Sequence, residues 1–159
     1  MSKIKLDDID HQILKILIKN CRTPFTDIAK DLLVSAGTIH IRVKKMEELG
    51  VIKGSTLVVD YNKLNYTFIA YVGLFVDNSS SFPTIISEID KINEVTVAHL
   101  TTGKFAIFCK IRAKNTIHAK NIIFRLDEIK GVIRTETSIS LEEVINDKQR
   151  LISNIIKEI

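Results

Sequence analysis

The sequence predicts an α+β protein, in which an N-terminal winged helix-turn-helix is followed by a C-terminal ferredoxin-like domain of order βαββαβ. Three observations lead to this prediction. Residues 7–52 contain three short amphipathic segments separated by tight turns. Residues 67–141 contain two copies of a strand–helix–strand pattern, offset by 37 positions. A polar, turn-prone stretch at residues 60–66 separates the two patterns.

The first two helices are expected over residues 7–20 and from residue 23 onward. Asp7 or Asp8 can cap the first, because a carboxylate accepts hydrogen bonds from the free amides of a helix start. Thr23-Pro24 opens the second, with Thr23 as N-cap and Pro24 at the first helical position. The predicted core-facing residues are Ile9, Ile13, Ile16 and Leu17 in the first helix and Phe25, Ile28, Ala29 and Leu32 in the second.

The third helix, from Ser35 to the turn at Gly50, has its start, two faces and end visible in the sequence. Ser35 is a favourable N-cap, and Gly50 suits the left-handed position that ends a helix. A helix with one buried face and an opposite face of cations and small residues suits a DNA major groove. The alternative is an amphipathic surface helix whose lysines are only solvated. Ile39, Val43 and Met46 share the core face, and the expected DNA-binding residues are Ser35, Ala36, Gly37, His40, Ile41, Arg42, Lys44, Lys45 and Lys53.

The segment after this helix is expected to form a small wing, because Lys53-Gly54-Ser55 separates two β-rich runs within residues 51–60. The polar stretch that follows is the best domain boundary. We therefore predict a helix-turn-helix domain at residues 1–60, a linker at 61–66, a ferredoxin-like domain at 67–143 and a C-terminal helix at 144–159.

The repeated pattern predicts four strands, at residues 68–76, 95–102, 105–113 and 132–141, and two helices, at 82–91 and 116–129. Two βαβ copies in series give a four-stranded antiparallel sheet with both helices on one face. The other face needs a cover, and a second copy of the chain is the expected one. The sequence therefore predicts a homodimer.

The last 18 residues read as a helix with a broad apolar stripe. Two interpretations stay open: the stripe packs on the helix's own domain, or it forms an oligomer contact. The stripe residues are Val144, Ile145, Lys148, Leu151, Ile152, Ile155, Ile156 and Ile159.

Composition excludes several classes of protein. Hydrophobic residues make up 45% of the 159 residues, enough for a real core, and the formal net charge of +4 favours an anionic partner only weakly. Cys21 and Cys109 lie far apart, which fits a reducing cytoplasm and excludes a disulfide framework. No apolar run is long enough to span a membrane, and no catalytic or metal-ligand spacing stands out, so we expect neither an enzyme nor a bound cofactor or metal.

Several short motifs together resemble the Lrp/AsnC family, the leucine-responsive or feast/famine transcription regulators. The resemblance covers about residues 6–143. It rests on a first-helix motif, a helix-turn-helix pattern, a glycine that opens the central turn, and a closing strand. The matching residues are Leu6, Asp7, Asp10, Ile13 and Leu14; then Arg22, Ile28, Ala29, Ser35, Ile39, Arg42, Val43, Gly50, Val51 and Ile52; then Gly103; and then Gly131, Val132, Thr135 and Ser138.

The resemblance implies a cytoplasmic regulator that binds double-stranded DNA, forms homodimers through its sheets and often assembles into octamers. It also implies that an amino acid or related metabolite binds near the turn after the second sheet strand. Gly103 favours a tight turn with exposed amides, and Lys104 adds a cation, so both features favour the acid end of a ligand. The expected effector-binding residues are Thr101, Thr102, Gly103, Lys104, Phe105, Ala106, Thr135 and Thr137.

Three positions depart from the family pattern. Leu33 stands where the family usually has glycine, and Ile41 where an arginine or polar residue is common. The turn residues Lys104 and Ala106 replace the usual acids, which would meet an amino-acid ammonium. A neutral or acidic ligand, such as a 2-oxo acid or a zwitterion held by its carboxylate, is therefore expected rather than lysine or arginine.

Two rival functions share this plan. Sirohaem decarboxylases have a similar architecture and hold a tetrapyrrole in the sheet domain, which here would involve His99. A dimer-interface residue is the simpler interpretation of His99. A stand-alone ligand-sensing sheet module is the other rival, and the intact helix-turn-helix argues against it.

Overall fold

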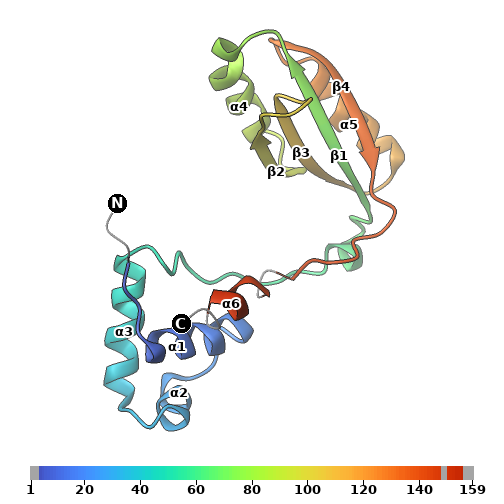
Figure 1. Ribbon diagram of the computed structural model, residues 1–159. Helices are drawn as coiled ribbons and strands as arrows, with labels where there is room; N and C mark the ends of the chain where they lie inside the picture. The colour runs from blue at the N-terminus through green and yellow to red at the C-terminus, as the bar shows by residue number, and fades with distance from the viewer. Residues whose placement is uncertain (1–3, 148–149, 156–159) are drawn as a thin grey trace. The chain divides into compact units, whose positions relative to one another are not determined.

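The computed structural model describes residues 4–147 and 150–155 (Figure 1). The chain forms two compact units. The helical unit contains the residues up to Val58 together with those from Ile145 onward, and the sheet unit is Val59–Val144. The predicted α+β class is confirmed. Among the described residues, no helix has the length and apolar character needed to cross a bilayer.

Three helices make up most of the helical unit: α1 (Asp8–Lys19), α2 (Phe25–Asp31) and α3 (Ala36–Glu48). Asp7 is the N-cap of α1 and forms a capping box with Asp10, because each side chain accepts the other's backbone N–H. The predicted core faces meet at the centre of the unit. Its buried members are Ile13, Leu14, Ile28, Ala29, Ile39, Val43 and Met46.

Two local predictions for this unit are wrong. Thr23 does not cap α2: Pro24 occupies the N-cap position, and the Thr23 hydroxyl donates to the Asn20 carbonyl at 2.8 Å. Thr23 therefore closes the preceding turn. The predicted wing also fails to form, because residues 51–60 contain no strand. No amide from 53 to 59 donates to a backbone acceptor within the described part of the chain, so this stretch has no strand partner there.

The turn between α2 and α3 closes on Leu33, which adopts φ 55°. This left-handed conformation is unfavourable for a residue with a Cβ, and it explains why glycine suits the position. The Leu33 side chain is 94% exposed, so no packing compensates. The Val34 amide then donates to the Ala29 carbonyl at 3.0 Å, which ties the turn back to α2.

The sheet unit begins with the short helix η1 (Tyr61–Leu64), capped by Asp60. Its strands are β1 (Phe68–Val76), β2 (Val95–Leu100), β3 (Ile107–Ala113) and β4 (Val132–Ile139). Its helices are α4 (Phe82–Asp90), preceded by η2 (Ser79–Ser81), and α5 (Thr116–Asp127). The strand order β2-β3-β1-β4, with every pair antiparallel, is that of the predicted ferredoxin-like fold.

Both helices cover the same face of the sheet (Figure 1). Val72 and Leu74 of β1, with Ile111 of β3, point into this core together with Ile85 of α4 and Ile122 of α5. Since side chains alternate along a strand, the neighbours of these residues lie on the opposite face. That second face is covered by no helix or strand of the sheet unit.

The C-terminal segment differs from the predicted helix. Residues 142–147 are not helical, and the Glu143 carboxylate accepts a hydrogen bond from Lys110 of β3, which holds this stretch against the sheet. The helix α6 runs only over Arg150–Ile155. Ile152 packs on the core of the helical unit, beside α1 (Figure 1). Lys148, Ile156 and Ile159 of the predicted stripe lie outside the described residues.

Candidate nucleic-acid interface and effector turn

The exposed face of α3 has the composition expected from the sequence. The Ser35 hydroxyl accepts the Thr38 amide at 3.0 Å and so caps the helix, with Ala36 and Gly37 in its first turn. Ile41 is 70% exposed. Because Ile39, Val43 and Met46 are buried on the other face, the helix presents Gly37, Ile41, Lys44 and Lys45 to the outside.

Lys44, Lys45 and Lys53 are exposed cations. Lys44 has a single weak partner, Glu48, at 4.0 Å. Lys45 and Lys53 have no ion pair within the described residues. His40 is exposed and lies 6.1 Å, between ring centroids, from Phe25 of α2. These side chains are available to an anionic partner without breaking a strong internal contact.

Arg42 differs from its neighbours because its guanidinium turns inward. Its Nη1 donates to both carboxylate oxygens of Asp7, at 2.7 and 2.8 Å, and to Oδ1 of Asp10 at 2.8 Å. The side chain of Arg42 is 25% exposed and that of Asp10 only 3%. The recognition helix is thereby joined to the N-terminal cap of α1.

The same contacts shift two pKa values. The hydrogen bond from Arg42 is the main cause that lowers the pKa of Asp7 below its ordinary 3.8, and the amide of Asp10 adds to it. In the other direction, the carboxylates raise the pKa of Arg42 above its ordinary value. Asp7 and Arg42 are therefore both charged at physiological pH. Their ion pair links two helices whose residues lie more than 30 positions apart in sequence.

The turn between β2 and β3, residues 101–106, is closed by its own hydrogen bonds. The Thr101 amide donates to the Ala106 carbonyl at 3.0 Å, and the Thr101 hydroxyl donates to the Phe105 carbonyl. Gly103 is exposed, does not have positive φ, and has open space where a Cβ would stand. The conformation of Gly103 therefore does not require a glycine, contrary to the expectation from the sequence. The neighbouring Thr102 is also exposed.

Lys104 is paired with an acid of the closing strand. Its Nζ lies 2.5 Å from Oε2 of Glu136, while Arg134 donates to the other oxygen at 2.8 Å. The Lys104 hydrogen bond is the main cause that lowers the pKa of Glu136. The cation that the sequence offered to a ligand carboxylate is therefore already neutralised by a protein carboxylate.

Thr135 and Thr137 lie on the other side of β4 from this pair. They stand opposite Leu74 and Val72, whose side chains are in the helix-covered core, whereas Glu136 stands opposite Gly73. Glu136 and the two threonines therefore point to opposite faces of the sheet. However, it is Glu136 that the structure brings to the turn, and the two threonines are not part of that cluster.

The uncovered sheet face carries four aromatic rings in contact, which we call the aromatic face. Tyr71 stacks on Phe108 at 5.8 Å, Phe108 on Phe105 at 5.6 Å, and Phe105 meets Phe75 edge-on at 5.3 Å between ring centroids. Gly73 makes room for this arrangement, because a Cβ there would lie 2.3 Å from Cδ1 of Phe105. Phe105, predicted as an effector residue, is thus a member of a sheet-face cluster.

The histidines are dispersed rather than gathered. His11 is buried, with its Nδ1 2.8 Å from the Asp7 carbonyl, and His118 lies 3.3 Å from Glu94. His99 is exposed on β2, opposite Phe108. The described residues contain no group of three or more His, Cys, Asp or Glu able to hold a metal ion.

Burial raises the pKa of the Cys109 thiol to about 11, so this buried cysteine is protonated at neutral pH.

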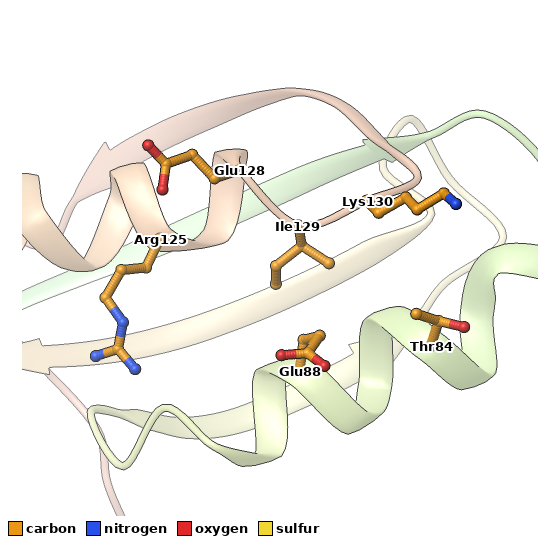
Figure 2. Close-up of a pocket in the computed structure, with 6 residues that line it drawn as sticks. All are labelled: Thr84, Glu88, Arg125, Glu128, Ile129 and Lys130. Atoms are coloured by element: carbon orange, nitrogen blue, oxygen red, sulfur yellow. The ribbon is translucent and has the colours of Figure 1, made fainter.

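A shallow groove of about 280 Å³ lies between α4 and the end of α5 (Figure 2). Ile129 faces α4 between the two helices, while Glu128 points away from it. Acidic and basic residues alternate around the groove, and Glu88 is paired with Lys91 at 2.6 Å. With both signs of charge balanced, the groove has no preference for one class of ion. It is lined by Thr84, Glu88, Arg125, Glu128, Ile129 and Lys130.

Two family models match the two parts of the chain. Residues 6–53 match the winged helix-turn-helix DNA-binding model, and residues 69–150 match the Lrp/AsnC ligand binding domain. The chain belongs to the Lrp/AsnC family. It is accordingly a DNA-binding transcriptional regulator of the Lrp/AsnC type, as the sequence motifs predicted.

Relatives and solved structures agree with this assignment. The regulatory protein AsnC of Haemophilus influenzae is 33% identical over 141 residues, which cover 88% of this chain and 94% of that protein. The structure of Escherichia coli AsnC matches with a TM-score of 0.87 and 30% identity, over 91% of this chain and 98% of the other. A Neisseria meningitidis transcriptional regulator in complex with L-Met has the same fold, with a TM-score of 0.86 and 18% identity over 91% of this chain and 96% of that one.

Sequence reasoning missed three residues of the Lrp/AsnC regulator that shape the candidate sites. Asp10 holds Arg42, Glu136 holds Lys104, and Gly73 admits the Phe105 ring. A glycine in the middle of an apolar strand is a signal for close approach by another group, and it was available in the sequence. The two ion pairs join positions 32 residues apart, and nothing local indicates them.

Proposed function

We propose that this Lrp/AsnC protein regulates transcription as a homodimer that binds double-stranded DNA through the exposed face of α3. The observation that carries the proposal is the division of α3 into a buried face and a cationic face with a capped N-terminus. Lys44, Lys45 and Lys53 supply phosphate contacts, since exposed cations displace condensed counterions from DNA. The amides at the start of α3, behind Ser35 and Ala36, suit a backbone phosphate.

Base readout falls to the first half of α3. Gly37 allows close approach, His40 can donate or accept at a base edge, and the exposed Ile41 fits a thymine methyl. Arg42 is given a different role from the one expected from sequence. Because its guanidinium is held by Asp7 and Asp10, we assign it to fixing α3 on α1 rather than to phosphate binding.

Two features support the homodimer. The aromatic face is half-buried and uncovered within the sheet unit, and cationic side chains lie against its rings. A matching copy would cover the ring surface that remains exposed. The amides of residues 53–59 donate to no backbone acceptor in the described part of the chain, and Leu57 and Val58 are exposed, so a strand from a second chain could pair with this stretch. Two-fold symmetry would require a roughly palindromic operator. Octamers built from such dimers, in the cytoplasm, are part of the same proposal.

The effector in this proposal is an amino acid or 2-oxo acid near residues 101–106. L-Met in the Neisseria meningitidis relative supports that class. Since Glu136 already pairs with Lys104, a ligand carboxylate must displace Glu136 or rely on backbone amides of the turn. Glu136, the acid that pairs with Lys104, could also meet an ammonium group there.

Selection of bound duplexes from a random pool tests the proposal. With purified protein, and with each amino acid and 2-oxo acid added in turn, we expect a pseudo-palindromic site whose occupancy changes with one ligand. Enrichment of no duplex sequence at all, at low salt, would contradict the DNA-binding role. A purified protein with a tetrapyrrole absorption band would favour the enzyme alternative.

A further inference from the structure

A pocket of about 260 Å³ lies at the end of the sheet opposite the 101–106 turn. It is formed by η1 together with Tyr66, two residues before β1, by the loop that enters β2, by β2 itself and by the end of β3. All of them belong to the sheet unit. The lining residues are Tyr61, Tyr66, Asn93, Glu94, Thr96 and Arg112.

Arg112 is held in a fixed orientation at this pocket. Its Nη1 donates to the Tyr66 carbonyl at 3.2 Å and reaches Asn62 Oδ1 at 3.5 Å. Its guanidinium carbon lies 5.3 Å from the centroid of the Tyr61 ring. Of its five N–H donors, those on Nη2 and Nε have no partner among the described residues. The guanidinium is therefore pre-positioned, half-buried and only partly hydrogen-bonded.

No carboxylate neutralises Arg112 within the described part of the chain. Glu94 lines the same pocket, but its oxygens are held by His118 at 3.3 Å and by Arg125 at 3.8 Å. The Lys114 amide donates to Nδ1 of His118, so Nε2 carries the proton that meets Glu94. Lys114 adds a further cation, 5.6 Å from the Tyr66 ring. The lining itself carries one cation, Arg112, and one anion, Glu94, and the neighbouring Lys114 and Arg125 make the surroundings of the pocket cationic.

The contrast with the 101–106 turn is direct. Lys104 in the turn is paired with Glu136, whereas Arg112 at the far end of the sheet has no acid partner among the residues that the structure describes. A guanidinium with free parallel donors binds a carboxylate in two-point geometry. The tyrosine rings give an apolar body a surface to lie on.

We propose that the Arg112 pocket binds a small carboxylate with an apolar body, the carboxylate on Arg112 and the body against Tyr61 and Tyr66. The site is separate from the turn in the proposed function and does not depend on it. Amino acids and 2-oxo acids share this chemistry. A bound carboxylate would join η1, which follows the helical unit in the chain, to β3.

Calorimetric titration of the full-length protein with three probes of one carbon skeleton tests this site. L-leucine and 4-methyl-2-oxopentanoate carry the carboxylate, and 3-methylbutylamine lacks it. We expect the two acids to bind and the amine not to bind. Because the chain has three tyrosines and no tryptophan, and two of the tyrosines line the pocket, tyrosine emission should change with the same affinity.

Variants separate this pocket from the turn. Arg112→Gln should lower the affinity for the acids by about tenfold or more, as loss of a charged hydrogen-bonded pair does. Arg134→Gln, a matched change at the other end of the sheet, should leave that affinity unchanged. Tyr61→Ala, at a partly exposed ring, should also weaken binding of the acids, because it removes the apolar surface and the ring on which the guanidinium stacks. Thermal melting checks that each variant folds. If the 101–106 turn also binds a ligand, Lys104→Gln should remove that binding event and leave the one at the Arg112 pocket.

Binding that survives Arg112→Gln and Tyr61→Ala but is lost in Lys104→Gln would overturn the proposal. So would failure of both acids to bind at millimolar concentration. Neither result bears on DNA binding, since no DNA is present in the titration.

Discussion

The exposed face of α3 and the turn at residues 101–106 both present lysines, but the two groups are in different electrostatic states. Lys44 has its nearest carboxylate at 4.0 Å and Lys45 has none within the described residues, whereas Lys104 lies 2.5 Å from Glu136. A lysine with a close acid partner is already neutralised, so a ligand carboxylate must compete with that acid for it. The difference indicates that the lysines of α3 are available to an anion, whereas the lysine of the turn is already paired within the protein.

Arg42 shows the same distinction within the helical unit. It belongs to the basic cluster in sequence, yet its guanidinium is directed at Asp7 and Asp10 instead of outward. Cations that look equivalent in sequence therefore divide into internal links and available contacts. The predictions below test that division, beginning with the largest expected effect.

Replacing Arg42 by methionine should destabilise the helical unit by about 3 kcal/mol, because the buried Asp10 carboxylate loses its charged partner. Lys44→Met, the matched change on the exposed face, should alter stability by no more than about 0.5 kcal/mol. Hydrogen exchange at the amides of α1 and α3 measures both. Equal effects of the two substitutions would show that Arg42 is not an internal link.

Gly73→Ala should disturb the aromatic face, because the added methyl would meet the Phe105 ring. Overpacking of this kind costs about 1–3 kcal/mol, and we expect the dimer to dissociate at higher protein concentration than the wild type. Sedimentation at several concentrations measures this. Gly103→Ala is the control, since a Cβ there has open space. If Gly73→Ala leaves dimer dissociation unchanged, the aromatic face is not the dimer interface.

Leu33→Gly should stabilise the helical unit by about 1 kcal/mol, because glycine adopts the left-handed conformation of the α2–α3 turn without strain. The exposed side chain contributes no packing that would be lost. Leu33→Ala keeps the Cβ and should give no comparable gain. Thermal unfolding of the three proteins decides, and a less stable glycine variant would mean that the turn is not strained.

Acid should weaken the link between α1 and α3. Because the pKa of Asp7 is lowered in the folded state, its stabilising contribution is complete above its ordinary pKa of 3.8 and is lost as pH falls below that value. We expect the melting temperature of the wild type to fall more steeply in this range than that of Asp7→Asn. Parallel curves for the two proteins would contradict the assignment of this ion pair.

Much of the fold could be predicted because its signals are local. The 37-residue repeat and strand alternation placed β1 at its observed bounds and the other strands within two residues. Apolar spacing identified the buried face of α3 through Ile39, Val43 and Met46. The wing was not predictable in this way, because a β-rich run becomes a strand only where a partner strand pairs with it.

The candidate sites were less predictable than the fold. The exposed face of α3 follows from helical periodicity, but the partner of each cation depends on tertiary contacts. Asp10 and Glu136 are far in sequence from the cations they hold, and Arg112 gave no motif at all. Strand parity places Glu136 and Thr135 on opposite faces of the sheet, but it does not indicate which of the two side chains the turn contacts.

The salt dependence of DNA binding tests the central division of cations most directly. Each phosphate contact contributes about 0.9 to the slope of log affinity against log salt concentration. Lys44→Ala should therefore flatten the slope by about that amount and weaken all sequences equally. Arg42→Ala should leave the slope unchanged while reducing the preference for specific over random DNA. A slope flattened by Arg42→Ala and unchanged by Lys44→Ala would contradict the account.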